Sequence, residues 1–132
     1  MNFLLDNNLP PALAHALNAL AEHDEHSVVA LRDKFAASTS DIDWIEALAG
    51  ERNWVVISQD HFTKREGLEK EAIIKSGLTV FCLKKGWAGL RYWEKAHNLV
   101  RWFPEIANQA ERITGGGSFW VPLKGHKFDP IF

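Results

Sequence analysis

Two aspartates lie where the sequence predicts the ends of buried parallel strands. Asp6 follows the apolar run at residues 2–5, and Asp60 follows a second apolar run at residues 54–58. Open α/β sheets place their active sites at the carboxyl ends of parallel strands, so these two carboxylates are expected at one edge. Carboxylate oxygens are the ligands that Mg²⁺ and Mn²⁺ prefer. Their spacing therefore predicts a divalent-metal site and phosphodiester chemistry.

A third acidic group lies between the first two in the sequence. Ser40, Asp41 and Asp43 open a segment with helical periodicity, in which Ser40 is suited to cap the first turn. Each acid also has a simpler interpretation: Asp6 could start a turn, Asp60 could be an ordinary turn residue, and Asp41 and Asp43 could be charges that favour a helix N-terminus. Turn residues have no reason to form three acidic groups after neighbouring elements, so together they favour a site.

The elements that must position these acids alternate between apolar runs and helical patterns. This alternation predicts a mostly parallel sheet with helices on both faces, which is a three-layer α/β/α sandwich. Gly77 is expected to end a helix, because glycine adopts left-handed backbone conformations readily. The expected strands are 2–5, 27–31, 53–58 and 78–83, and the expected helices are 10–22, 41–50 and 67–76.

The last third of the chain is less regular. Residues 88–111 are predicted to be helical, with Pro104 kinking that helix or starting a new one. Trp93, Ala96, Val100 and Phe103 are expected on its apolar side. Residues 118–123 are expected to form an edge strand, since Pro122 removes a backbone donor. The predicted organisation is one domain over residues 1–123 followed by a C-terminal tail at 124–132.

Size and composition limit the function classes. The chain has 132 residues, of which 46 % are hydrophobic and 24 % charged, as in a single globular domain. It has no apolar stretch long enough to span a membrane and no apparent signal segment, so we expect a cytoplasmic protein. Its single cysteine, Cys82, lies in an apolar run and is expected to be buried and inert.

Charge is divided unevenly along the chain. Residues 1–62 carry 10 acidic and 3 basic side chains, a net charge of −7, whereas residues 63–132 carry 7 acidic and 12 basic ones, a net charge of +5. An acidic pocket beside a basic surface is what a metal-dependent nuclease needs. The alternative is that solvated helix faces simply differ in sign.

Three sequence segments resemble the signature of the PIN-like superfamily, and in particular its VapC-like branch. They are Phe3-Leu4-Leu5-Asp6-Asn7-Asn8-Leu9-Pro10-Pro11, Ser40-Asp41 at a helix start, and Val55-Val56-Ile57-Ser58-Gln59-Asp60-His61-Phe62. The resemblance covers about residues 2–83. It implies a PIN-like α/β/α fold and a metal-dependent endoribonuclease that is the toxin of a type II toxin-antitoxin system. It also implies Mg²⁺ or Mn²⁺ as cofactor, RNA as substrate, a cognate antitoxin as partner, and a surface suited to a homodimer.

Carried over by motif, the resemblance makes Asp6, Asp41 and Asp60 the catalytic and metal-binding acids. The spacing from Asp41 to Asp60 is about one residue longer than in the family pattern, so Asp43 is a rival for the second acid. The family also has a fourth acid shortly after the third, whereas this chain has no acid at residues 61–64. Glu66 and Glu69 are the candidates to replace it, and the alternative function is a PIN-like module that binds RNA or protein without catalysis.

Several other residues are candidates for contact with RNA. Lys64 and Arg65 follow the third acid and could contact phosphates, although an ordinary solvated turn would explain them too. Asn7 and Asn8 are interpreted as supporting residues beside Asp6. Trp87 and Trp120 are open candidates for stacking on bases, because they lie beside basic or glycine-rich turns.

Two other fold families also place acids at strand ends. A phosphoacceptor receiver domain needs an acidic pair after the first strand and a lysine after the fifth; here Asp6 is followed by Asn7, although Lys124 is suitably late. A haloacid-dehalogenase-type phosphatase needs Asp-x-Asp, and Asn8 occupies the second acidic position. Both fit less well than a nuclease.

Overall fold

A six-stranded sheet forms the centre of the computed structural model, which describes residues 1–59 and 68–131. The strand order is β2-β1-β3-β4-β5-β6; strands β1 to β5 run parallel to one another, and β6 pairs with β5 in the antiparallel direction. Strand β1 is thus central, beside β3. The strands are β1 (Asn2–Leu5), β2 (Ser27–Ala30), β3 (Trp54–Ser58), β4 (Thr79–Leu83), β5 (Gly117–Val121) and β6 (Asp129–Pro130).

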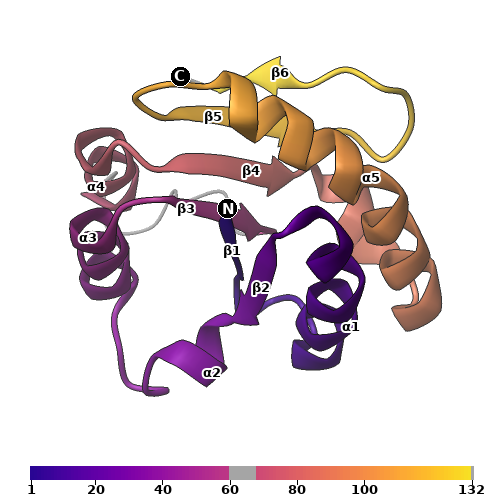
Figure 1. Ribbon diagram of the computed structural model, residues 1–132, viewed down its shortest axis with the longest axis horizontal. Helices are drawn as coiled ribbons and strands as arrows, with labels where there is room; N and C mark the ends of the chain where they lie inside the picture. Colours follow the sequence, from indigo (N-terminus) through magenta and orange to yellow (C-terminus); the bar gives the residue numbers. More distant parts are fainter. Residues whose placement is uncertain (60–67, 132) are drawn as a thin grey trace.

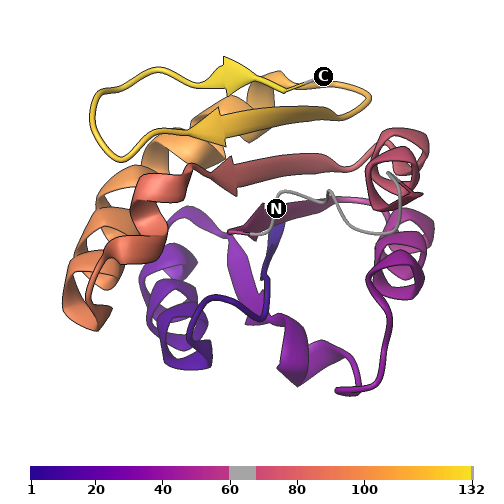
Figure 2. The same ribbon diagram turned by 180° about the vertical axis from the view of Figure 1, so that it is seen from behind.

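Helices cover the two faces of this sheet in pairs (Figures 1 and 2). Helices α1 (Pro11–Ala21) and α5 (Tyr92–Arg112) pack on one face, and α3 (Asp41–Glu51) and α4 (Leu68–Ser76) pack on the other. Short helix α2 (Leu31–Lys34) follows β2, and 3₁₀ turns occupy Glu22–Asp24 and Lys85–Gly89. No helix in residues 1–59 or 68–131 has both the length and the apolar character needed to cross a lipid bilayer.

Two apolar cores separate these layers, because successive side chains of a strand point to opposite faces. Phe3 and Leu5 of β1 lie in the core shared with α1 and α5, whereas Leu4 lies in the core shared with α3 and α4. Buried on both faces, the strands read as continuous apolar runs in the sequence. The predicted α/β/α sandwich with a mostly parallel sheet is confirmed.

The predicted elements before residue 84 agree closely with the observed ones. Each strand and helix expected in this region has an observed counterpart whose ends lie within one residue of the expected ones. The short helix α2 is additional to them. Gly77 ends α4 with a left-handed backbone, at φ 70°, as its type predicts. Cys82 is buried, as expected.

The last third of the chain differs from its prediction in α5. The helix runs as one element through Pro104, so the expectation that a new helix could begin there was wrong. The expected apolar face was wrong at two of its four residues, because Trp93 is 80 % exposed and Val100 is 38 % exposed, whereas Phe103 is buried and Ala96 packs against the core. Besides Phe103, the helix buries Leu99, Trp102, Ile106, Ala107 and Ala110 against the sheet. This extensive packing offsets the loss of one backbone hydrogen bond at proline.

Strand β5 was expected at the edge of the sheet, but β6 lies outside it. Pro122 follows the end of β5, and the chain then returns so that Asp129 pairs with Trp120 and Pro130 with Phe119. Phe128 packs against the core beside β5. Residues 124–131 thus add a strand to the sheet.

Candidate functional site

Asp6 lies directly after β1, at the carboxyl-terminal edge of the central strand. Its backbone N–H donates to the carbonyl of Ile57 on β3, at 3.1 Å, and its own carbonyl accepts from Leu9 N–H at 3.0 Å. These bonds fix the backbone at the point where the strand gives way to the turn before α1. Only 5 % of Asp6 is exposed, which is low for a carboxylate.

Both oxygens of the Asp6 carboxylate accept hydrogen bonds. The backbone N–H of Asn7 donates to Oδ1 at 2.6 Å, and the Ser58 hydroxyl donates to Oδ2 at 2.7 Å. Ser58 is fully buried at the end of β3. Because each carboxylate oxygen accepts a hydrogen bond along a lone-pair direction, these two bonds set the orientation of the carboxylate.

Asn7 and Asn8 connect the strand ends around Asp6. Asn7 Oδ1 accepts from Arg32 Nε at 3.0 Å, which joins the end of β1 to the segment after β2. Asn8 Oδ1 accepts from the backbone N–H of Gln59 at 3.2 Å, which joins β1 to the end of β3. The side-chain amides thus hold three strand ends together at this edge.

Arg32 is a site residue that the sequence interpretation missed. It lines a cavity of about 220 Å³ together with Asp6, Asn7 and Leu9, so an arginine and the buried aspartate border the same space. The same strand-end rule that selected Asp6 would have selected Arg32, which lies two residues beyond the end of β2. Ser58 was also missed, although it ends β3 two residues before Asp60.

Asp41 begins α3 and has its orientation set by the first turn of that helix. Ser40 caps the helix by accepting from Asp43 N–H at 3.1 Å, as predicted. The indole of buried Trp44 donates to Asp41 Oδ1 at 3.0 Å. Because α3 leads back from β2 to the start of the parallel strand β3, its first turn belongs to the same edge of the sheet as Asp6.

A polar contact anchors the far end of α3. Lys34 Nζ donates to Glu51 Oε1 at 3.0 Å, and the Trp54 indole donates to the same oxygen at 3.1 Å. The hydrogen bond from Lys34 is the main reason that the pKa of the Glu51 carboxyl lies below its ordinary value; the Trp54 bond and the Lys34 charge add to it. Helix α3 is thereby tied both to α2 and to the start of β3.

The other predicted acids divide into two groups. Asp43 is exposed on α3, and Glu69 is buried in the first turn of α4, with 2 % exposure. Within residues 1–59 and 68–131, no three His, Cys, Asp or Glu side chains form a group that could hold a metal ion. Asp60, Glu66, Lys64 and Arg65 lie outside the described residues, so the complete acidic set stays a prediction.

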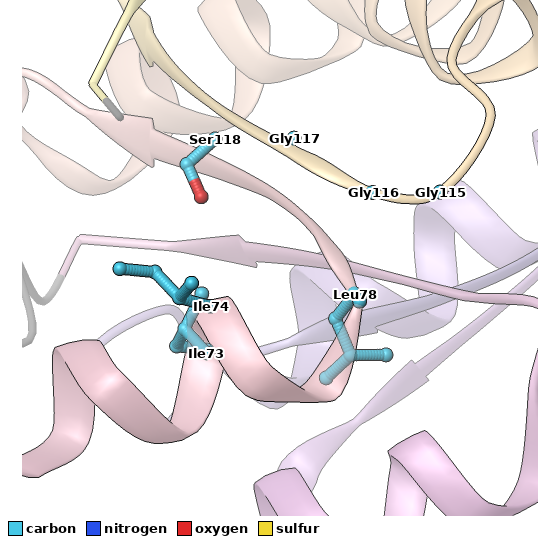
Figure 3. Close-up of a pocket in the computed structure, with 8 residues that line it drawn as sticks. Ile73, Ile74, Leu78, Gly115, Gly116, Gly117 and Ser118 are labelled. Carbon is cyan, nitrogen blue, oxygen red and sulfur yellow. The ribbon is translucent and has the colours of Figure 1, made fainter.

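A second cavity lies at the opposite edge of the sheet, where β4 and β5 begin (Figure 3). It has a volume of about 230 Å³, and its lining side chains are Ile73, Ile74, Leu78 and Ser118. Two glycine segments meet there. A Cβ placed on Gly116, whose φ is 87°, would lie 2.3 Å from the carbonyl oxygen of Gly77. The lining contains no titratable group, so this cavity is not a candidate active site.

Comparison with known proteins identifies a family for this chain. Neither the curated proteins nor the solved structures contain a match to this chain. A family model does match, namely that of the PIN-like domain, over residues 1–85. The matched segment runs from β1 past the end of β4 and thus includes Asp6, Arg32, Asp41 and Ser58. By this match over more than half of its length, the chain belongs to the PIN-like domain family.

Proposed function

We propose that this protein is a metal-dependent endoribonuclease, which hydrolyses phosphodiester bonds of RNA. The observation that carries the proposal is the Asp6 carboxylate, buried at the end of the central strand and oriented through both of its oxygens. PIN-like domains form a superfamily of nucleases, and such an oriented carboxylate is what a catalytic metal requires of its ligand.

The proposed cofactor is Mg²⁺ or Mn²⁺, held by Asp6, Asp41 and Asp60. The two described members fit this role by donor chemistry, since both offer hard carboxylate oxygens held in place by hydrogen bonds. The bound ion would lower the pKa of a coordinated water and neutralise charge on the phosphate. Asp43, Glu66 and Glu69 remain candidates for a fourth carboxylate.

The protein's own groups then have distinct tasks. Ser58 and Asn7 N–H hold the Asp6 carboxylate in one orientation. Arg32, held through its Nε by Asn7, is placed to bind a phosphate oxygen through its remaining N–H groups. Asp60 is the candidate to orient or deprotonate the attacking water. Lys64 and Arg65 are candidates for contacts to flanking phosphates.

The biological role that we propose is that of a VapC-like toxin in a type II toxin-antitoxin system. Its partners would be an RNA substrate, a cognate antitoxin that covers the acidic site, and a second copy in a homodimer. Growth arrest on expression, relieved by the product of a neighbouring small gene that co-purifies with the protein, would support this role. A protein that is purified alone and leaves growth unchanged would contradict it.

The test of the enzymatic proposal is cleavage of a mixed-sequence RNA in the presence of Mn²⁺, Mg²⁺ or EDTA. The wild type should cleave only with metal. Asp6→Asn should lower the cleavage rate by more than about 100-fold. The loss of a residue that only hydrogen-bonds to a metal ligand already lowers metal affinity or activity about 10–100-fold, and Asp6 is itself a proposed ligand. Circular dichroism should show the same fold in both proteins.

A second candidate function is an RNA- or protein-binding module without catalysis. It is favoured by the absence of an acid at residues 61–64, where the family pattern has its fourth acid. Measurable Mn²⁺ binding by the wild type, weakened by Asp6→Asn and accompanied by no RNA cleavage, would select this candidate over the enzyme.

A further inference from the structure

The edge that carries Asp6 continues into a basic region at the ends of β4 and β5. Lys84 and Lys85 follow β4 directly, and with Gly86 and Trp120 they line a cavity of about 480 Å³. This volume falls within the roughly 300–1,000 Å³ typical of sites that bind small ligands. Its size and its lining of lysines and an indole suit one nucleotide.

Strand register connects this cavity to the candidate active site. Ser58 on β3 pairs with Cys82 on β4, Cys82 pairs with Trp120 on β5, and Trp120 pairs with Asp129 on β6. Ser58 in turn donates to Asp6. We name this set the register row; it comprises Asp6, Ser58, Cys82, Trp120 and Asp129.

The register row lies on one face of the sheet. Cys82 belongs to the core shared with α3 and α4, and Trp120 packs against that core. Neighbouring strands are about 4.8 Å apart, so Trp120 lies about 10 Å along the row from Ser58. A single-stranded oligonucleotide bound at Asp6 could therefore reach the cavity without crossing the sheet.

Positive charge prevails at this part of the edge. Lys84 Nζ donates to Asp129 Oδ2 at 3.0 Å, so its charge is largely balanced. Lys85 is exposed and forms no ion pair with any residue in the described part of the chain. Lys124 is also exposed and follows Leu123, whose side chain would lie 3.8 Å from a Cβ on Gly86.

We infer that the cavity at Lys84, Lys85, Gly86 and Trp120 is a subsite for single-stranded RNA, which holds a nucleotide beside the one to be cleaved. Trp120 offers an indole surface for stacking on a base, and Lys85 offers a cation for the adjoining phosphate. This inference rests on the proposed function for its choice of RNA as ligand. It adds that the RNA must be unpaired, since a base within a duplex is not available for stacking on a side chain.

The test measures RNA binding in the Asp6→Asn background with EDTA, so that cleavage does not enter the result. The probe is a fluorescently labelled single-stranded RNA of mixed sequence, titrated at several salt concentrations. Lys85→Ala should weaken binding about threefold to tenfold and reduce the slope of log K against log salt by about 0.7, the value for one phosphate contact. Trp120→Ala should weaken binding about tenfold, and Trp120→Phe should retain most of the affinity.

Two controls make the test specific. Lys75→Ala removes an exposed lysine at the end of α4, on the opposite edge of the sheet, and should leave affinity and salt slope unchanged. The RNA duplex of the same sequence should bind more weakly than the single strand. Because Lys85 is exposed, its variant is expected to fold even if Trp120→Ala does not.

Three results would overturn the inference. They are an affinity and a salt slope that Lys85→Ala leaves unchanged, equal affinity for duplex and single strand, and a cavity that takes up an acidic peptide but no RNA. None of these would affect wild-type cleavage with metal, on which the proposed function stands. Conversely, the wild type could bind RNA in a way that Lys85→Ala and Trp120→Ala weaken, yet cleave no RNA with any metal. That result would support the subsite and contradict the proposed nuclease activity.

Discussion

Two cavities at opposite edges of the parallel sheet differ in what they contain. At the carboxyl-terminal edge, a cavity of about 220 Å³ has Asp6 and Arg32 in its lining. At the amino-terminal edge, a cavity of about 230 Å³ is formed by isoleucine, leucine and glycine, with Ser118 as its polar side chain. The volumes of these two cavities are nearly equal, so they are distinguished by the end of the strands at which they lie and not by their size.

The edges also differ in how they are held together. Side-chain hydrogen bonds from Ser58, Asn7 and Asn8 connect the strand ends around Asp6. At the opposite edge the backbones of Gly77 and Gly116 approach so closely that a Cβ on Gly116 has no room. We therefore expect substitutions at the first edge to reduce activity and substitutions at the second to reduce stability.

Gly116→Ala should have the largest effect and should act on stability. A left-handed backbone costs a non-glycine residue about 1–2 kcal/mol, and the added methyl group must also displace the Gly77 carbonyl. We expect the free energy of unfolding in urea to fall by more than about 2 kcal/mol. The fraction that remains folded should cleave RNA at the wild-type rate.

Gly115→Ala is the matched control, since Gly115 also has a left-handed backbone, at φ 82°, but a Cβ added there would have no atom within 4 Å. Its free energy of unfolding should fall only by the cost of a left-handed backbone at alanine, about 1–2 kcal/mol. If both variants lost the same free energy of unfolding, the close approach of Gly116 to Gly77 would have no part in the destabilisation.

Ser58→Ala should have the next largest effect and should act on activity. Without the hydroxyl, the Asp6 carboxylate loses the hydrogen bond from Ser58 to Oδ2, and a positioning residue of this kind is worth about 10–100-fold in metal affinity or rate. The measurements are Mn²⁺ affinity by calorimetry and kcat with saturating Mn²⁺. Ser58→Thr keeps a hydroxyl and should recover most of both.

Ser118→Ala is the control for Ser58, because it removes a second buried serine hydroxyl, at the amino-terminal edge. Its Mn²⁺ affinity should equal that of the wild type. If both serine variants reduced metal affinity alike, the contrast between the two edges would be lost.

Arg32→Ala should have the smallest effect of these substitutions, and it should act on the binding of RNA. The loss of one guanidinium–phosphate contact should raise KM about tenfold, with a smaller change in kcat. Arg32→Lys keeps the charge but loses the forked geometry and should recover only part of the loss. Steady-state cleavage at two salt concentrations would measure both.

The exposed Arg112, at the end of α5 near the amino-terminal edge, provides the charge-matched control. Arg112→Ala should leave KM unchanged. A comparable rise in KM for both arginine variants would mean that net charge, and not position, governs RNA binding.

The sequence was most informative where one physical signal dominated. The short apolar runs predicted four parallel strands, and Gly77 marked a helix end that favours a left-handed residue. The position of Asp6 followed from the first of those strands. In α5, by contrast, tertiary packing of Leu99, Trp102 and Ile106 outweighed the local effect of Pro104, which sequence patterns alone overestimate.

The parts of the site that could not be predicted depend on contacts between distant segments. Ser58 and Asp6 are 52 residues apart, and their hydrogen bond is evident only once β1 and β3 are known to be neighbours. Strand β6 has two residues, one of them proline, and thus carries no periodic pattern. The interpretation of Trp87 as a stacking candidate was wrong, because its side chain is fully buried and donates to the Val121 carbonyl.

The register row has a consequence for how this protein can change over evolutionary time. Because the side chains of a strand alternate between faces, one inserted or deleted residue within β4 or β5 would move every following side chain to the opposite face. Lys84 and Trp120 would then point toward α5, away from the face that holds Ser58. Substitutions along these strands can be tolerated one at a time, but a change in their length cannot. Homologous chains should therefore vary in residue type within β3, β4 and β5 while keeping the number of residues in each strand constant.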